Sequence, residues 1–196
     1  MLGGRRAARI DTGREPHDDA RLIGLICQRD PRAFEQLYRA YHPRLSRFLG
    51  AILRRAPVVE EVLNDTMLVV WTHPDRYNGK SKLSTWIFAI AYRKALKALR
   101  RADEPVEDKQ ADSRPSLEPG PEQQLGAREA QTVLLKAIGE LSADHRAVVD
   151  LTYFHEAGYR EIAEIMDCPV DTVKTRMFHA RRHLKTRLAG RLADWL

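Results

Sequence analysis

Cysteine, long apolar runs and strand patterns are scarce in this chain of 196 residues, and each scarcity excludes a class of protein. Only Cys27 and Cys168 are present, far apart and with no His or Cys at metal-ligand spacing, so neither a disulfide framework nor a zinc site is expected. We expect both thiols to be small buried apolar residues. No stretch is apolar enough for a signal peptide or a membrane span, which favours a cytoplasmic protein without a membrane partner.

Acidic residues are missing from two long stretches of the chain. No Asp or Glu occurs in residues 77–102 or 172–193, whereas Lys and Arg are frequent in both. The net charge of +6 favours an anionic partner but does not choose between nucleic acid and a membrane surface. The two acid-free stretches indicate two separate cationic surfaces.

Apolar residues recur at helical spacing and nothing has the pattern of a strand, so we predict an all-α fold. The expected parts are a mobile arm at residues 1–19, a small helical domain at 20–101, a flexible acidic, Pro-rich linker at 102–127 and a second small helical domain at 128–190. In the first domain a helical pattern continues beyond Pro43, and another helix opens at Thr85. In the second domain, Ser142 is the predicted N-cap of a helix.

Residues 159–182 have the pattern of two helices around a tight turn, and the second helix is strongly basic. Spacing of three and four places one apolar set on a single face that we expect to be buried: Val173, Met177, Ala180, Leu184 and Leu188. Lys174, Phe178 and Arg181 project from the opposite side. An aromatic ring among cations is typical of a helix that reads the major groove of DNA.

The helix that opens at Thr85 carries a second candidate surface. Trp86, Arg93, Lys97 and Arg100 share one face of it. Cations for phosphates and an indole that stacks on a base are what single-stranded nucleic acid binding requires. The alternative is that Trp86 is a core residue at a helix start.

Two further patterns need an interpretation. Glu60, Glu61 and Asp65 form an acidic patch near Trp71, which is either a docking site or a solvated helix face. His155-Glu156 begins like a zinc-protease helix, but Tyr159 stands where that motif requires its second His, so we expect a loop there. No arrangement of nucleophile, base and oxyanion donors is found, and we predict neither an enzyme nor a cofactor.

Residues 20–188 resemble the extracytoplasmic-function (ECF) sigma factors of bacterial RNA polymerase, in the sigma-70 family. The resemblance is carried by residues 59–71, 78–87, 90–101 and 165–176. It implies a sigma region 2 helical bundle and a sigma region 4 helix-turn-helix. It implies core docking by Glu61, Asp65 and Trp71. The residues that it implies for the −10 element are Asn78, Lys80, Ser81, Trp86, Arg93, Lys97 and Arg100. Those that it implies for the −35 element are Lys174, Thr175, Arg176, Phe178, His179, Arg181 and Arg182.

The implied partners are promoter DNA, an anti-sigma protein and core RNA polymerase, through its largest-subunit clamp helices and second-largest-subunit flap. The acidic linker would lie in the basic RNA path of the polymerase. Three positions depart from the family pattern: Val58 replaces a common acid, Arg93 a common Asn, and Asp171 a usual Gly. The alternative function is a transcriptional regulator that binds operators alone through its helix-turn-helix, which gel shifts without polymerase would reveal.

Overall fold

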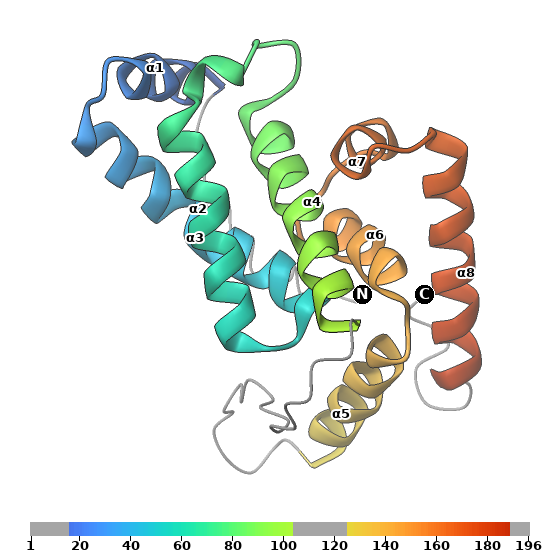
Figure 1. Ribbon diagram of the computed structural model, residues 1–196. Helices are drawn as coiled ribbons and strands as arrows, with labels where there is room; N and C mark the ends of the chain where they lie inside the picture. The colour runs from blue at the N-terminus through green and yellow to red at the C-terminus, as the bar shows by residue number, and fades with distance from the viewer. Residues whose placement is uncertain (1–15, 104–124, 189–196) are drawn as a thin grey trace, which may run out of the picture.

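The computed structural model describes residues 16–103 and 125–188, and every regular element in these two ranges is a helix (Figure 1). The predicted all-α fold is therefore confirmed. The N-terminal half comprises α1 (Pro16–Cys27), α2 (Pro31–Leu53), α3 (Ala56–Thr72), the short 3-10 helix η1 (Pro74–Arg76) and α4 (Leu83–Asp103). The C-terminal half comprises α5 (Leu125–Gly139), α6 (Ala143–Tyr153), α7 (Tyr159–Met166) and α8 (Val170–Leu188).

Local signals in the sequence set where α2 and α6 begin. The Asp30 carboxylate accepts from the backbone N–H of Arg32 at 2.9 Å, and Pro31 takes the first helical position, where no N–H is needed. Helix α2 then continues through Pro43, as predicted. The Ser142 hydroxyl accepts from the His145 N–H at 3.3 Å, which confirms Ser142 as the N-cap of α6.

The core of the N-terminal half lies where α2, α3 and α4 meet. Phe48 of α2 and Phe88 of α4 pack with their ring centroids 5.1 Å apart, and both side chains are fully buried. Thr66 of α3 is also buried, and its hydroxyl donates to the Val62 carbonyl at 2.7 Å. Its polar atom is thus satisfied within its own helix.

The two halves lie against each other, with α6 and α7 beside α2 and α4 (Figure 1). The buried apolar residues of both halves form one continuous cluster. This arrangement brings together helices that the sequence assigns to separate domains.

Cys27 is exposed and Cys168 is half-buried, so the prediction that both thiols are buried is wrong. Cys27 is the last residue of α1, and the apolar face of that helix is supplied instead by Leu22, Ile23 and Ile26.

The expected arm and linker fall mostly on residues 1–15 and 104–124, outside the described residues. Helix α1 begins at Pro16, within the range expected for the arm.

Candidate nucleic-acid and polymerase interfaces

The turn between α7 and α8 has the geometry of a helix-turn-helix. Asp167 ends α7 in the left-handed conformation, with φ of 50°, and the next N–H, from Cys168, donates to the Ala163 carbonyl at 3.1 Å. Pro169 precedes α8, and its carbonyl accepts from the Thr172 N–H at 2.9 Å. The chain therefore turns sharply within three residues, and α8 packs across α7 (Figure 1).

Helix α8 has one buried and one exposed face. The predicted apolar stripe is buried at all five positions: Val173, Met177, Ala180, Leu184 and Leu188. The exposed face carries most of the residues expected to contact the −35 element: Lys174, Thr175, Phe178, His179, Arg181 and Arg182. Phe178 is 61% exposed, and its ring contacts that of His179 with the two centroids 5.5 Å apart.

Arg176 does not share that exposed face. Its guanidinium pairs with the Asp144 carboxylate of α6 at 2.5 Å and donates to the Cys168 sulfur at 3.7 Å. Only 24% of the side chain is exposed. In this structure Arg176 therefore braces α8 against α6 and is not directed toward solvent.

Two exposed charges on α8 already have partners. The Lys174 ammonium lies 2.9 Å from the Asp171 carboxylate, one helical turn earlier. The Arg181 guanidinium donates to the Tyr153 hydroxyl at 3.2 Å and lies 5.9 Å from the centroid of that ring. Each contact holds a cation in a defined place on the exposed face. Breaking either contact to bind another partner costs little free energy, because exposed pairs contribute only about 0–1 kcal/mol.

The loop before α4 is ordered by its own side chains. The Asn78 side chain accepts from the Lys80 N–H at 3.0 Å, and Gly79 takes the left-handed conformation that the turn requires, with φ of 69°. The Tyr77 hydroxyl donates to the Ser81 carbonyl at 2.7 Å. Residues 78–81 are thus presented as an exposed or half-exposed loop directly before the helix.

Trp86 lies at the boundary between the core and the surface. It is half-buried against the core, and its ring lies 5.6 Å from that of Tyr77. Further along α4, Arg93, Lys97 and Arg100 are exposed. Helix α4 therefore presents a row of cations that continues from a partly accessible aromatic pair.

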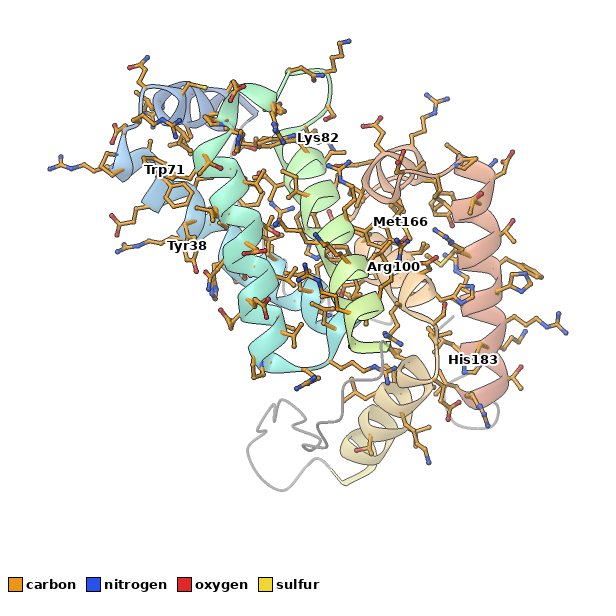
Figure 2. The ribbon with its side chains drawn as sticks, viewed as in Figure 1. Tyr38, Trp71, Lys82, Arg100, Met166 and His183 are labelled. Atoms are coloured by element: carbon orange, nitrogen blue, oxygen red, sulfur yellow. The ribbon has the colours of Figure 1, made fainter. Side chains whose placement is uncertain are left out.

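The acidic patch lies on α3. Glu61 and Asp65 are exposed, and the Asp65 carboxylate pairs with the Lys94 ammonium of α4 at 3.1 Å. Trp71 is half-buried at the other end of α3, where it contacts Phe34 with ring centroids 5.1 Å apart. Figure 2 shows Trp71 and Tyr38 on the side of the molecule away from α7 and α8.

Sequence reasoning missed Leu68 on this face. Leu68 is 56% exposed and follows Glu61 and Asp65 at steps of four and three, so the three residues share one face of α3. That spacing was a usable signal, because it places a leucine on the same helix face as the two acids. The acidic patch on α3 therefore combines two carboxylates with an exposed apolar side chain, as protein-binding surfaces do.

The described residues contain neither a candidate metal site nor a candidate membrane span. Within residues 16–103 and 125–188, no group of three or more His, Cys, Asp or Glu side chains could hold a metal ion. None of the helices described is both long and apolar enough to cross a membrane. His155 lies in the loop after α6, as predicted, and not on a helix of the zinc-protease kind.

Comparison with protein-family models matches each half of the chain to a described region of one family. The family model for sigma-70 region 2 matches residues 37–104, and that for sigma-70 region 4 matches residues 131–184. Together these matches span more than half of the chain. The two cationic helices, α4 and α8, lie one in each matched segment.

Similar proteins extend over nearly the whole chain. The ECF RNA polymerase sigma-E factor of Haemophilus influenzae is 26% identical over 180 residues, covering 87% of this chain and 95% of that protein. The sigma-E factor of Escherichia coli is 27% identical over 182 residues, covering 87% and 94%. The ECF sigma factor RpoE of Cereibacter sphaeroides is 27% identical over 162 residues, covering 82% and 89%.

Solved structures share the fold. CnrH, in complex with the cytosolic domain of CnrY, superposes with a TM-score of 0.65 at 21% identity, covering 89% of this chain and 99% of that one. RpoE of Bartonella quintana, in complex with the anti-sigma factor NepR, gives 0.62 at 23% identity, covering 81% and 98%. Family models, relatives and fold agree: the chain belongs to the ECF branch of the sigma-70 family and is an alternative sigma factor, a non-enzymatic protein that directs transcription initiation.

Proposed function

We propose that the two cationic helices read the two halves of a promoter while α3 holds core RNA polymerase. In this assignment α8 binds the −35 element, and α4 with its preceding loop binds the −10 element. The observation that carries it is the exposed face of α8, where Phe178 stands uncovered among cations above a fully buried stripe. The ring is flanked by Lys174, Arg181 and Arg182 on the same exposed face, and apolar contact with a thymine methyl beside cationic contacts suits major-groove reading.

The residues on α8 suit different parts of a DNA site. Phe178 fits a thymine methyl group, whereas Lys174, Arg181 and Arg182 suit guanine edges or phosphates. Thr175 and His179 lie on the same exposed face. Arg176 would have to leave Asp144 to reach DNA, so the other members of the set carry the proposed contact.

The proposed −10 contact is of another kind, since it involves unstacked bases. Trp86 and its neighbour Tyr77 offer aromatic surface for a base, worth roughly 1–3 kcal/mol per stacked base. Exposed or half-exposed residues of the preceding loop and of α4 supply polar and cationic contacts to the displaced strand: Asn78, Lys80, Ser81, Arg93, Lys97 and Arg100. Promoter opening then draws on binding energy alone.

The proposed polymerase contact lies on α3. Glu61, Asp65 and Leu68 form its exposed face, and Trp71 supports the end of the helix. We assign the largest-subunit clamp helices to this face and the second-largest-subunit flap to the C-terminal half, in the cytoplasm. An anti-sigma protein is a further proposed partner, because RpoE of Bartonella quintana, which shares the fold, was solved with one.

The test of the −35 assignment is Phe178→Ala in run-off transcription with purified core enzyme and promoters from a genomic library. Loss of a base contact worth about 1–3 kcal/mol should reduce discrimination between promoters by roughly tenfold. The docking of core polymerase on α3 should stay unchanged, because α8, which carries Phe178, lies on the opposite side of the molecule from α3 (Figure 1).

Leu135→Ala is the matched control, since Leu135 is 56% exposed but lies on α5, outside the reading helix. It should leave discrimination between promoters unaltered. Equal discrimination by the wild type and the Phe178 variant would reject the role given to this ring.

A further inference from the structure

One carboxylate lies in the middle of the exposed face of α8. Asp171 is in the first turn of this helix and is the one Asp or Glu among its 19 residues. Steps of three, four and seven place Lys174, Thr175 and Phe178 on the same face. The side chain of Asp171 is 89% exposed, so packing does not account for it. An anionic group thus stands among the residues proposed to contact the −35 element.

The carboxylate of Asp171 is held by a side chain and not by the start of the helix. The Lys174 ammonium donates to its Oδ1 atom at 2.9 Å. Within the described ranges no backbone N–H donates to this carboxylate, and the Pro169 carbonyl takes the N–H groups of Thr172 and Val173 instead, at 2.9 and 3.3 Å. Asp171 therefore does not cap the helix in this structure.

The pair of Asp171 and Lys174 still has hydrogen-bonding capacity for another partner. An ammonium has three donors and a carboxylate has two acceptor oxygens, and the contact between them uses one donor and one oxygen. Lys174 retains 59% exposure of its side chain. The neighbouring Thr175 hydroxyl instead donates to the Asp171 carbonyl at 2.9 Å, so its proton is used within the helix. The pair therefore presents an acceptor and a donor side by side.

One base pair offers the complementary pattern in the major groove of DNA. Cytosine exposes its N4 amino donor, and the paired guanine exposes its O6 and N7 acceptors next to it. The N4 and O6 atoms are hydrogen-bonded to each other and thus lie about 2.9 Å apart, as do the paired atoms of Asp171 and Lys174. The carboxylate can therefore accept from cytosine while the ammonium donates to guanine of the same pair.

Other base pairs match the Asp171–Lys174 pair less well. Adenine also has an amino donor, but thymine places one acceptor and a methyl group where guanine has two acceptors. A G·C pair in the reverse orientation puts acceptor atoms against the carboxylate, which repels them. Because the carboxylate is also repelled by phosphates, it disfavours every site that lacks an amino group at this position. Discrimination then comes from repulsion as well as attraction.

We propose that Asp171 determines the specificity of the −35 contact by selecting, together with Lys174, one C·G pair in the major groove. The first turn of a reading helix is the part that contacts base edges, and Asp171 lies there. The inference rests on the proposed assignment of α8 to the −35 element. Arg182, on the same exposed face, supplies attraction to phosphates that does not depend on sequence.

The experiment selects promoter fragments from a library randomised across the −35 element, with holoenzyme reconstituted from core polymerase and the full chain. The wild type should enrich cytosine at one position. Asp171→Asn keeps the size of the side chain but replaces one oxygen with an amide donor, and asparagine suits the N6 and N7 atoms of adenine. We expect the enriched base at that position to change from cytosine to adenine, and affinity for the wild-type site to fall by about tenfold.

A second variant tests whether the two side chains act on one base pair. Lys174→Met keeps a long side chain but removes the donors, so it should weaken the preference at the same position as Asp171→Asn. Because both residues contact one pair, the double variant should lose less discrimination than the sum of the two single losses. Separate positions for the two variants, with additive losses, would contradict the joint reading of one pair.

Glu164→Gln is the matched control, because Glu164 is an exposed acid on α7, the helix before the turn, and its loss removes the same charge. It should leave every base preference unaltered. An acid in a first turn also stabilises a helix, so urea denaturation measures the stability of each variant. The base preference is a ratio between promoters, which a change in helix stability alone does not move.

Three outcomes decide the proposal. Enrichment of adenine in the Asp171→Asn selection supports it, whereas cytosine enrichment that persists in this variant overturns it. A position that merely loses its preference, without gaining adenine, would mean that Asp171 only orients Lys174, and this also overturns the base contact. Phe178→Ala in the same selection tests the assignment of α8 separately. If that variant leaves all −35 preferences unchanged, the assignment itself fails.

Discussion

Single arginines close the ends of helices far from them in sequence. The Arg29 guanidinium donates to the Trp71 carbonyl at 2.6 Å and so caps α3, while Arg54 and Arg146 cap α5 and α2. The carbonyl end of a helix carries partial negative charge and unpaired acceptors, so a cation there gains both an electrostatic and a hydrogen-bonding contribution. In this fold, arginine has a structural role in addition to the proposed contacts with DNA.

The two thiols differ in environment and should differ in reactivity. Cys27 is exposed, whereas burial raises the pKa of Cys168, with Asp144 and Asp167 adding to this effect and Arg176 opposing it. Because the thiolate is the nucleophile, a raised pKa lowers the reactive fraction at neutral pH. We expect iodoacetamide to modify Cys27 faster than Cys168 by about tenfold at pH 7.5, measured by mass spectrometry of the peptides.

The same measurement in denaturant is the control, and there the two cysteines should react at similar rates. In the folded chain the rate at Cys168 should keep rising as the pH increases toward its raised pKa. Equal rates in the folded chain at pH 7.5 would contradict the environment described for Cys168.

At the scale of elements, the start of α6 depends on one hydroxyl. Ser142 accepts from the His145 N–H, one of the first donors of the helix, which have no intrahelical partner. Ser142→Ala should lower the free energy of unfolding by about 1 kcal/mol, as is typical for loss of an N-cap. Urea denaturation followed by circular dichroism measures this change.

Ser142→Asp keeps a cap acceptor and adds a negative charge at the helix start, so it should preserve the stability of the wild type. If the alanine and aspartate variants lost the same amount of stability, the effect would not come from the cap.

Helices were predictable because their signals are local. The stripe from Val173 to Leu188 and the N-cap at Ser142 each lie within one element, and both are confirmed. The side-chain direction of Arg176 was not predictable in this way. Its position on the helix lies at the edge of the exposed face, and its partner Asp144 is in another helix. The periodicity of the sequence predicts which face of a helix is buried. It does not predict which charged residues at the edge of the exposed face pair with residues of other helices.

At the scale of the molecule, no pattern in the sequence indicated that the two halves pack together. The contacts join residues far apart in the chain, such as Lys82 with Glu161, and several end on backbone carbonyls, which every residue type supplies. The acid-free stretch around α4 indicated an anionic partner. In this structure, part of that charge is met by the Glu161 carboxylate of the C-terminal half, which pairs with Lys82.

The exposed cations of α4 allow a prediction for the assembled holoenzyme on its promoter. Lys97 is exposed and stands one turn from Arg93 and Arg100, in a row suited to successive phosphates. Lys97→Gln should weaken promoter binding uniformly across promoter sequences and reduce the slope of log K against log salt concentration by about 0.7–0.9, because one fewer counterion is released.

Lys136→Gln is the matched control, since Lys136 is an exposed lysine of α5 outside both cationic faces, and it should leave the slope unchanged. Titrations of fluorescent promoter DNA at several salt concentrations measure both slopes. A Lys97 variant that kept the wild-type slope but altered the preferred −10 bases would show that Lys97 contacts a base edge and not a phosphate. The salt slope and the base preference therefore distinguish positioning contacts from sequence reading on the same helix.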